Sequence, residues 1–148
     1  NKKTIACAES LIGGLISSTI TAVPGSSNVL KGSIVSYMYE IKSKLLSVNK
    51  NLLKTKGAVN EECAKQMAKG AKDSLNVDIA ISATGIAGPS KDEFDTPVGT
   101  VFIGVYSRLK GHSVFAKSFR YVFEGDREAV RNSAAEQAIA EICKLLNI

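Results

Sequence analysis

A strand-to-helix turn near the N-terminus carries the residues best suited to chemistry. The hydroxyl of Ser10 lies between a short extended run, 3–6, and an apolar helical pattern, and Gly13 and Gly14 follow it. A helix N-terminus offers unpaired N–H groups and a positive dipole end, and glycine lets a ligand approach the backbone closely. Ser10 is therefore a candidate nucleophile, although a serine here can also cap a helix without any chemical role.

Length and composition favour one folded domain over residues 1–148. A chain of 148 residues with 45% hydrophobic residues can bury roughly 70% of the surface that its unfolded state exposes, without disulfides or metals. No apolar run approaches the ~20 residues of a membrane span, and the first residues do not match a signal peptide. The missing initiator Met indicates a trimmed chain or a domain of a longer protein.

Cysteine usage favours a cytoplasmic protein. Cys7, Cys63 and Cys143 are an odd number and are far apart, which argues against a disulfide framework and a zinc site. Each thiol has apolar or helical neighbours and is interpreted as a small buried hydrophobe. The acidic residues Asp92, Glu93 and Asp95 are interpreted as a solvated loop, and no motif indicates a metal or organic cofactor.

A net charge of +5 and a pI of about 9.1 favour anionic ligands. A small phosphorylated ligand fits this balance, and so does a merely solvated basic surface. Nucleic acid is less well supported, because Trp is absent and the chain has no block of basic residues. No membrane partner is expected.

Hydrophobic patterning predicts strands that alternate with helices, with one late hairpin. The expected strands are 3–6, 33–37, 78–83, 101–107 and 112–123, and the expected helices are 13–22, 40–48, 60–75 and 127–146. The last helix buries a row at i+4 spacing, Val130, Ala134, Ala138 and Ile142, and exposes Arg131, Asn132, Glu136, Glu141 and Lys144. The pattern predicts an α/β domain whose mixed, mostly parallel sheet of about five strands is covered on both faces.

The predicted topology brings three loops together. In such sheets, ligands bind beyond the carboxyl ends of the parallel strands. The loops after the first three strands begin at Glu9, Tyr37 and Thr84. These loops, which collect glycines and polar residues, should lie at one edge of the sheet.

Seven motifs in order resemble the C-terminal domain family of competence-damage-inducible CinA proteins, across almost the whole chain. The motifs are Ala8-Glu9-Ser10-x-x-Gly13-Gly14, Pro24-Gly25-Ser26-Ser27, Tyr37-x-x-Glu40-x-Lys42, Gly57-Ala58-Val59, Thr84-Gly85-Ile86-Ala87-Gly88-Pro89, Pro97-Val98-Gly99-Thr100-Val101 and Gly125-Asp126-Arg127. The resemblance implies a three-layer α/β/α fold and a homodimer. It also implies an amidase that hydrolyses nicotinamide mononucleotide to nicotinic acid mononucleotide and ammonia, in pyridine nucleotide salvage.

The resemblance places the nucleophile at Ser10 and its base at Lys42. A serine hydroxyl is a weak nucleophile until a neighbour takes its proton, and a lysine can do so when burial or nearby positive charge lowers its pKa. His112 is the only histidine and lies at the predicted hairpin turn, which argues against a Ser-His-Asp triad. The N–H groups near Gly13 and Gly14 are candidate oxyanion donors.

Further residues are expected to bind substrate. Tyr37 matches a family position near the substrate, although it could also be a core aromatic at a strand end. Thr84 and the loop from Gly85 to Gly88 could cradle a phosphate or form only a turn. Arg127 could bind the phosphate bidentately, although it could also be a surface charge. Glu9 is expected to orient Lys42 or another donor.

The sequence departs from the family pattern at three places, and two of these departures, Leu11-Ile12 and Tyr39, suggest an alternative function. Leu11-Ile12 replaces the usual Cys-Thr, Tyr39 replaces an asparagine, and Thr96 replaces a lysine. These changes alter polar groups around the nucleophile and remove a positive charge. The alternative is a catalytically weakened nucleotide-binding or dimerisation module of a larger CinA-like protein.

Overall fold

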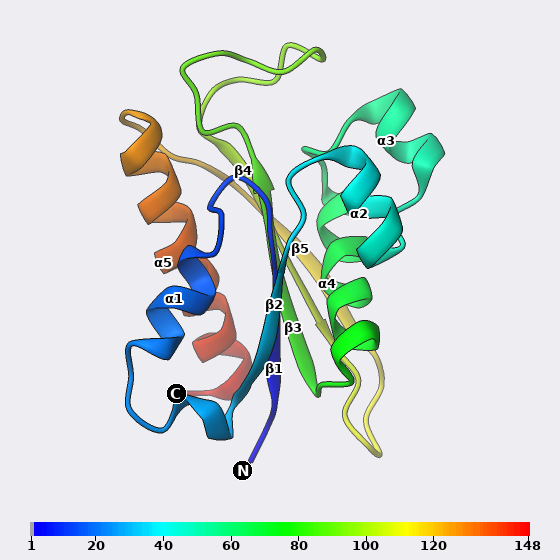
Figure 1. Ribbon diagram of the computed structural model, residues 1–148, viewed down its shortest axis with the longest axis vertical. Coiled ribbons are helices and arrows are strands. Elements are labelled where there is room, and N and C mark those ends of the chain that lie inside the picture. The colour runs from blue at the N-terminus through cyan, green and yellow to red at the C-terminus, as the bar shows by residue number, and fades with distance from the viewer. Residues whose placement is uncertain (1) are drawn as a thin grey trace.

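A five-stranded sheet forms the centre of the computed structural model, which describes residues 2–148; Asn1, the first residue of the predicted domain, lies outside them (Figure 1). The strands are β1 (Ile5–Glu9), β2 (Leu30–Val35), β3 (Ile79–Gly85), β4 (Thr100–Ser107) and β5 (Phe115–Val122), in the order β2-β1-β3-β4-β5. β1 is parallel to both β2 and β3, whereas β4 is antiparallel to both β3 and β5. The sheet is therefore mixed, as predicted.

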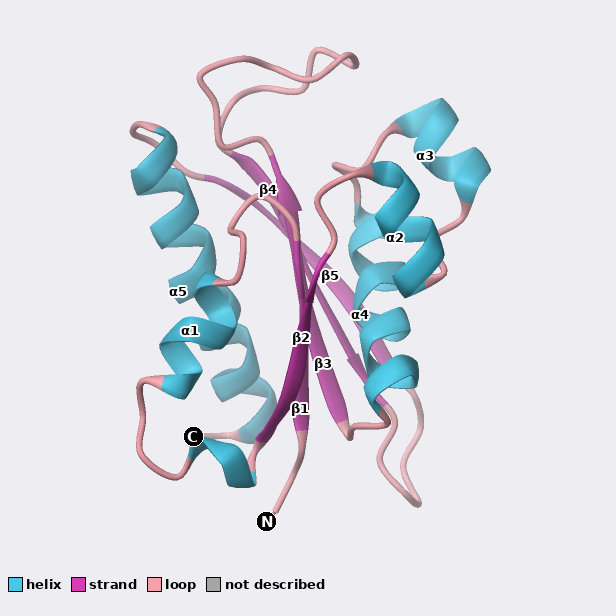
Figure 2. Cartoon of the chain, in the orientation of Figure 1, coloured by secondary structure: helices cyan, strands magenta, loops and turns pink. Residues whose placement is uncertain are grey.

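Helices cover both faces of the sheet, which confirms the α/β fold with three layers (Figure 2). One face carries α1 (Leu15–Thr21) and α5 (Arg127–Leu146), and the other carries α2 (Tyr39–Leu46), α3 (Lys50–Lys56) and α4 (Glu61–Leu75). A short 3-10 helix, Ser26–Asn28, joins α1 to β2. No helix among residues 2–148 is long and apolar enough to cross a bilayer.

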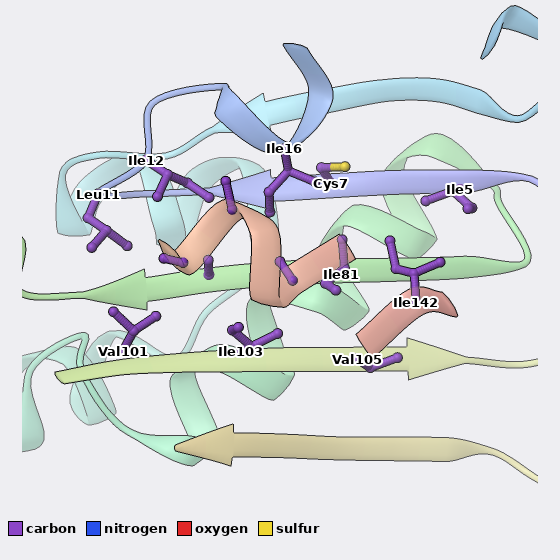
Figure 3. Close-up of a cluster of buried hydrophobic side chains, with 14 of the residues drawn as sticks. Ile5, Cys7, Leu11, Ile12, Ile16, Ile81, Val101, Ile103, Val105 and Ile142 are labelled. Atoms are coloured by element: carbon purple, nitrogen blue, oxygen red, sulfur yellow. The ribbon is translucent and has the colours of Figure 1, made fainter. Parts of the chain in front are cut away.

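The middle strands are almost entirely apolar because both of their faces are covered. Every residue of β1 is buried, and only Gly85 of β3 is partly exposed, as expected for strands at the centre of a covered sheet. Alternate side chains supply two cores. Figure 3 shows the core beneath α1 and α5, which includes Leu11, Ile12 and Ile103.

The two longest helices begin where their capping residues predict. The side chains of Asn60 and Asp126 accept from the backbone N–H groups of Cys63 and Ala129, respectively, and each thereby satisfies one free N–H of a first turn. The predicted buried row of α5 is confirmed, since Val130, Ala134, Ala138 and Ile142 are all buried.

Several predicted details are wrong. The first strand, β1, begins two residues and ends three residues later than the predicted 3–6, and the sequence pattern does not predict α3. α3 has only seven residues and one buried side chain, so it has too little apolar periodicity to be found in the sequence. The predicted exposure of Glu141 is also wrong: its carboxylate is buried and accepts from Tyr121 Oη at 2.6 Å.

α4 packs closely against the sheet at Gly104. A Cβ added at Gly104 of β4 would lie 2.3 Å from the backbone oxygen of Ala64. That same oxygen accepts a hydrogen bond of 2.6 Å from Ser82 Oγ of β3. The absence of a side chain at Gly104 therefore lets α4 dock on β3 and β4, and Asn60, the N-cap of α4, donates to the Gly57 carbonyl at 2.9 Å, next to Ala58 in the cavity wall.

Candidate active site

A cavity of about 470 Å³ opens at the carboxyl ends of β1, β2 and β3, where the three predicted loops meet. Figure 1 shows the turn after β1, the start of α2 and the long loop between β3 and β4 at this end of the sheet. The cavity is lined by Ser10, Leu11, Tyr37, Tyr39, Lys42, Ala58, Val59, the segment 84–92 and Arg127. The structure thus brings seven of the ten predicted site residues together: Ser10, Lys42, Tyr37, Thr84, Gly85, Gly88 and Arg127.

Backbone hydrogen bonds hold Ser10 at the carboxyl end of β1. Its N–H donates to the backbone oxygen of Ala83 on β3 at 3.1 Å, which extends the parallel pairing by one residue beyond β1. Its carbonyl accepts from the N–H of Gly13 at 3.1 Å. The side chain is buried, with 8% of the residue exposed, and its hydroxyl faces the cavity. Ser10 is therefore not the N-cap of α1, which is Gly14.

Lys42 reaches Ser10 from the first turns of α2. Its Nζ lies 2.8 Å from Ser10 Oγ, 2.6 Å from the carbonyl oxygen of Ser36 and 3.0 Å from that of Tyr37. The residue is 1% exposed. Burial lowers the pKa of Lys42 from 10.5 to about 8, because a low-dielectric site disfavours the charged amine.

The three partners of Lys42 suit a general base. A neutral amine has two N–H donors and one lone pair, and the carbonyl oxygens of Ser36 and Tyr37 accept both donors. The lone pair is then left for the third partner, the hydroxyl of Ser10. In that state Ser10 Oγ–H donates to Lys42 Nζ, which is the arrangement needed to remove the proton as the oxygen attacks.

The structure does not place the predicted oxyanion donors at the cavity. The N–H of Gly13 is already bonded to the Ser10 carbonyl, and neither Gly13 nor Gly14 lines the cavity. Both have positive φ angles of 57° and 109°, so they shape the turn. The N–H of Leu11 has no acceptor among residues 2–148, and Leu11 lines the cavity. Leu11 is therefore the better candidate donor.

Glu9 also does not reach the cavity. Its fully buried carboxylate accepts from the N–H groups of Ile16 and Ser17, and from the hydroxyls of Ser17 and Ser33 at 2.7 and 2.8 Å. An anion at the first turn of α1 is favoured by the free N–H groups there. Glu9 therefore ties the end of β1 to α1 and β2 and forms no hydrogen bond with Lys42.

The two predicted phosphate-binding elements line the same wall. Arg127 Nη1 donates to the carbonyl oxygen of Gly88 at 2.7 Å, and its Nη2 lies 3.4 Å from Tyr37 Oη. The remaining N–H groups of this exposed guanidinium are available to a ligand. Thr84 differs from expectation in one respect, because its buried hydroxyl donates to the Ala58 carbonyl and so supports the wall.

The acidic loop closes one side of the cavity. Asp92 accepts from the N–H and hydroxyl of Thr96, each at 2.8 Å, so its carboxylate stabilises the loop. Tyr39 Oη donates to Glu93 Oε1 at 3.2 Å. Phe94 lies against Gly57, where an added Cβ would be 2.7 Å from the phenyl ring. The part of the chain that the structure describes has no cluster of three or more potential metal ligands.

Arg131 is a site residue that sequence reasoning missed. The sequence pattern predicts Arg131 on the solvent face of α5, but it is half-buried and donates to the carbonyl oxygens of Leu11 and Ile12 at 2.9 and 3.3 Å. The signal was its spacing: Arg131 follows Arg127 by four residues, so both lie on one side of α5. That side faces the turn carrying Ser10.

Other candidate nucleophiles are less suitable than Ser10. Burial raises the pKa of the Cys63 thiol to about 12, and thiolate is the reactive form of cysteine. Neither Cys63 nor Cys7 lines the cavity. His112 lies in an exposed turn, as predicted, and does not line the cavity.

Comparison with known sequences identifies the family. Residues 1–146 match the model of the CinA C-terminal domain. A CinA-like protein of Thermotoga neapolitana is 42% identical over 146 residues, which are 99% of this chain and 34% of the relative. Another, from Prochlorococcus marinus, is 53% identical over 104 residues, or 70% of this chain and 24% of the relative. The chain thus spans about a third of the length of the first relative.

Solved structures share the fold. The competence damage-inducible protein A of Klebsiella pneumoniae superposes with a TM-score of 0.91 and 29% identity, covering 99% of this chain and 88% of that one. A CinA superfamily protein of Escherichia coli gives a TM-score of 0.89 and 31% identity, with 97% and 81% covered. With the family model matching nearly every residue, this chain belongs to the CinA C-terminal domain family.

Proposed function

We propose that this domain is an amidohydrolase that converts nicotinamide mononucleotide to nicotinic acid mononucleotide and ammonia. The observation that carries the proposal is the 2.8 Å approach of Lys42 Nζ to Ser10 Oγ in the wall of a cavity. The proposed role is in pyridine nucleotide salvage, with residues 1–148 forming one domain. The identity of the substrate is inferred from the family resemblance. The reaction type is inferred from the Ser10–Lys42 pair in the cavity.

In the acylation step, Ser10 Oγ attacks the carboxamide carbon while its proton passes to Lys42 Nζ. The negative charge on the former carbonyl oxygen is stabilised by the Leu11 N–H. The tetrahedral intermediate collapses when the C–N bond breaks, and Lys42 returns the proton to the leaving nitrogen. Ammonia leaves and an ester joins the nicotinoyl group to Ser10.

In the deacylation step, water takes the place of ammonia. Lys42, neutral again, accepts a proton from water as its oxygen attacks the ester carbon. The second tetrahedral intermediate expels Ser10 Oγ, which recovers its proton from Lys42. Nicotinic acid mononucleotide is released, and the enzyme returns to its starting state without any metal or organic cofactor in the scheme.

Recognition of the phosphate is assigned to Arg127 and the N–H groups of the loop from Gly85 to Gly88. A guanidinium matches phosphate geometry with two parallel hydrogen bonds. Tyr37, which contacts Arg127 through its hydroxyl and is 59% exposed, can cover the pyridinium ring. A cation over an aromatic face is favourable.

The direct test is to incubate the purified domain with nicotinamide mononucleotide and measure both products. We expect ammonia and nicotinic acid mononucleotide in equal amounts. Calorimetry on the same sample separates the alternative function, since a nucleotide-binding module would bind the substrate without releasing ammonia. Absence of both turnover and binding would contradict either function.

The pH dependence follows from the state of Lys42. The free amine is the active base, so kcat/KM should rise about tenfold per pH unit below the pKa and level off above a midpoint of about 8. Measurement of initial rates from about pH 6 to about pH 10 would show this limb. A rate that falls across this range would contradict a neutral lysine base.

Arg127→Met should reduce selectivity for a phosphorylated substrate. Loss of a charge-assisted contact of about 1.5–3 kcal/mol corresponds to an increase in KM of about ten- to a hundredfold. Nicotinamide riboside, which lacks the phosphate, is the matched control, and its kcat/KM should change little. Equal losses for both substrates would place Arg127 outside the phosphate site.

The departures from the family pattern are only partly at the site. Ile12 is fully buried in the core and Thr96 bonds to Asp92, and neither lines the cavity. Only Leu11 and Tyr39 do so. These positions support an intact reacting pair over the alternative. The homodimer and the cytoplasmic location stay predictions.

A further inference from the structure

Arg131 contacts the turn that carries the nucleophile without lining the cavity. Its guanidinium, projecting from the second turn of α5, donates to two successive carbonyl oxygens, through Nε to Leu11 at 2.9 Å and through Nη2 to Ile12 at 3.3 Å. A Cβ added at Gly13 would lie 3.4 Å from Nη2, so the next residue of the turn also faces this cation. Arg131 thus holds the backbone immediately after Ser10.

These contacts fix the direction of the N–H groups in the turn. The peptide unit is planar and trans, so its C=O and N–H point in opposite directions. The Ile12 carbonyl, which accepts from Arg131 and also from the Leu15 N–H at 3.1 Å, shares its unit with the Gly13 N–H. That N–H donates to the Ser10 carbonyl at 3.1 Å. The Ser10 carbonyl in turn shares its unit with the Leu11 N–H.

The Leu11 N–H belongs to the last of these connected peptide units. It is directed away from the bonded Ser10 carbonyl and has no acceptor among the described residues. Leu11 lines the cavity and its side chain is anchored in the core. A donor that is fixed before the reaction stabilises a developing charge without any reorganisation cost.

We propose that Arg131 is a positioning residue, which orients the peptide units of the turn so that the Leu11 N–H faces the developing oxyanion. This inference rests on the proposed amide hydrolysis, because it concerns the transition state of that reaction. It does not concern substrate affinity, which the cavity wall provides. Arg131 acts from the far side of the turn and touches neither the substrate nor Lys42.

The test compares Arg131→Met and Arg131→Lys with Arg120→Met, a control that removes an exposed arginine from β5. Two substrates are used, nicotinamide mononucleotide and the ester p-nitrophenyl acetate, since both develop an oxyanion. We expect Arg131→Met to lower kcat by about 10²-fold for both, as a small displacement of reacting groups can do. Arg131→Lys should recover only part, because one ammonium lacks the fork that spans two carbonyls.

Three readouts separate positioning from a merely structural role. The burst of p-nitrophenol counts active sites, so kcat is expressed per active site and unfolded protein does not contribute. The KM for nicotinamide mononucleotide and the midpoint of the pH profile should stay at their wild-type values. A kcat per active site equal to that of the wild type would overturn the inference and leave the Ser10–Lys42 proposal standing. Failure of the wild type to hydrolyse either substrate would instead overturn the proposed function and this inference with it.

Discussion

Replacement of Ser10 by alanine should abolish ammonia release from nicotinamide mononucleotide, with a loss in kcat on the order of 10⁴-fold or more. The reason is that the acyl-enzyme can form only on the Ser10 oxygen. No thiol lines the cavity, and burial raises the pKa of Cys63 to about 12. The measurement is the initial rate of ammonia release at saturating substrate.

The fold should survive this change. Ser10 anchors the turn through its backbone N–H and carbonyl, and both remain in the variant. The side chain contributes only its contact with Lys42. The matched control is Ser43→Ala, which removes a hydroxyl on α2 that lies outside the cavity and makes no side-chain hydrogen bond within residues 2–148; it should keep full activity. Turnover by the Ser10 variant at the wild-type rate would exclude Ser10 as nucleophile.

Replacement of Lys42 by methionine should lower kcat by about 10²–10⁴-fold, the range for loss of a general base. Methionine fills a similar volume and cannot accept a proton. Lys42→Arg should fail equally, because a guanidinium stays protonated in proteins. Lys44→Met, which removes an exposed lysine two residues further along α2, is the control and should leave kcat unchanged.

The Lys42→Met substitution should affect stability much less than it affects activity. The folded-state pKa of about 8 lies below the ordinary 10.5, so the unfolded chain binds more protons between these values and the Lys42 contribution to stability rises with pH there. Below about pH 8 the buried ammonium costs free energy, which Lys42→Met removes. The loss of hydrogen bonds to the Ser36 and Tyr37 carbonyls opposes this gain. We therefore expect an inactive variant that stays folded, with a Tm within a few degrees of the wild type. Activity at the wild-type level would contradict Lys42 as the base.

The loop between β3 and β4 borders the cavity through its residues up to Asp92. Two loop residues contact the opposite wall: Glu93 accepts a hydrogen bond from Tyr39, and Phe94 packs against Gly57. Burial, followed by the nearby Glu93, raises the pKa of Tyr39, so the phenol remains a donor to this carboxylate at neutral pH. Tyr39 therefore joins this loop to the opposite wall of the cavity.

The sequence determined much about this protein because the relevant signals are local. Nearly continuous apolar runs identified β3 and β4 as buried strands, Asn60 and Asp126 marked helix starts, and the order of the elements was enough for an α/β sheet. Strand polarity then follows from connectivity, so the meeting of Ser10, Tyr37 and Thr84 at one edge could be expected before any coordinates. The pairing of Ser10 with Lys42 came from the motifs and their resemblance to a family.

Only the tertiary structure decided which polar groups are free to act. Glu9 and Ser10 are neighbours in the sequence, yet the pleat directs the Glu9 carboxylate to α1 and leaves the Ser10 hydroxyl at the cavity. The Gly13 N–H donates to the Ser10 carbonyl within the turn, and the Arg131 guanidinium donates to the Leu11 carbonyl instead of facing solvent. A hydrogen bond depends on direction and on competing partners far apart in the chain, and residue type and spacing specify neither.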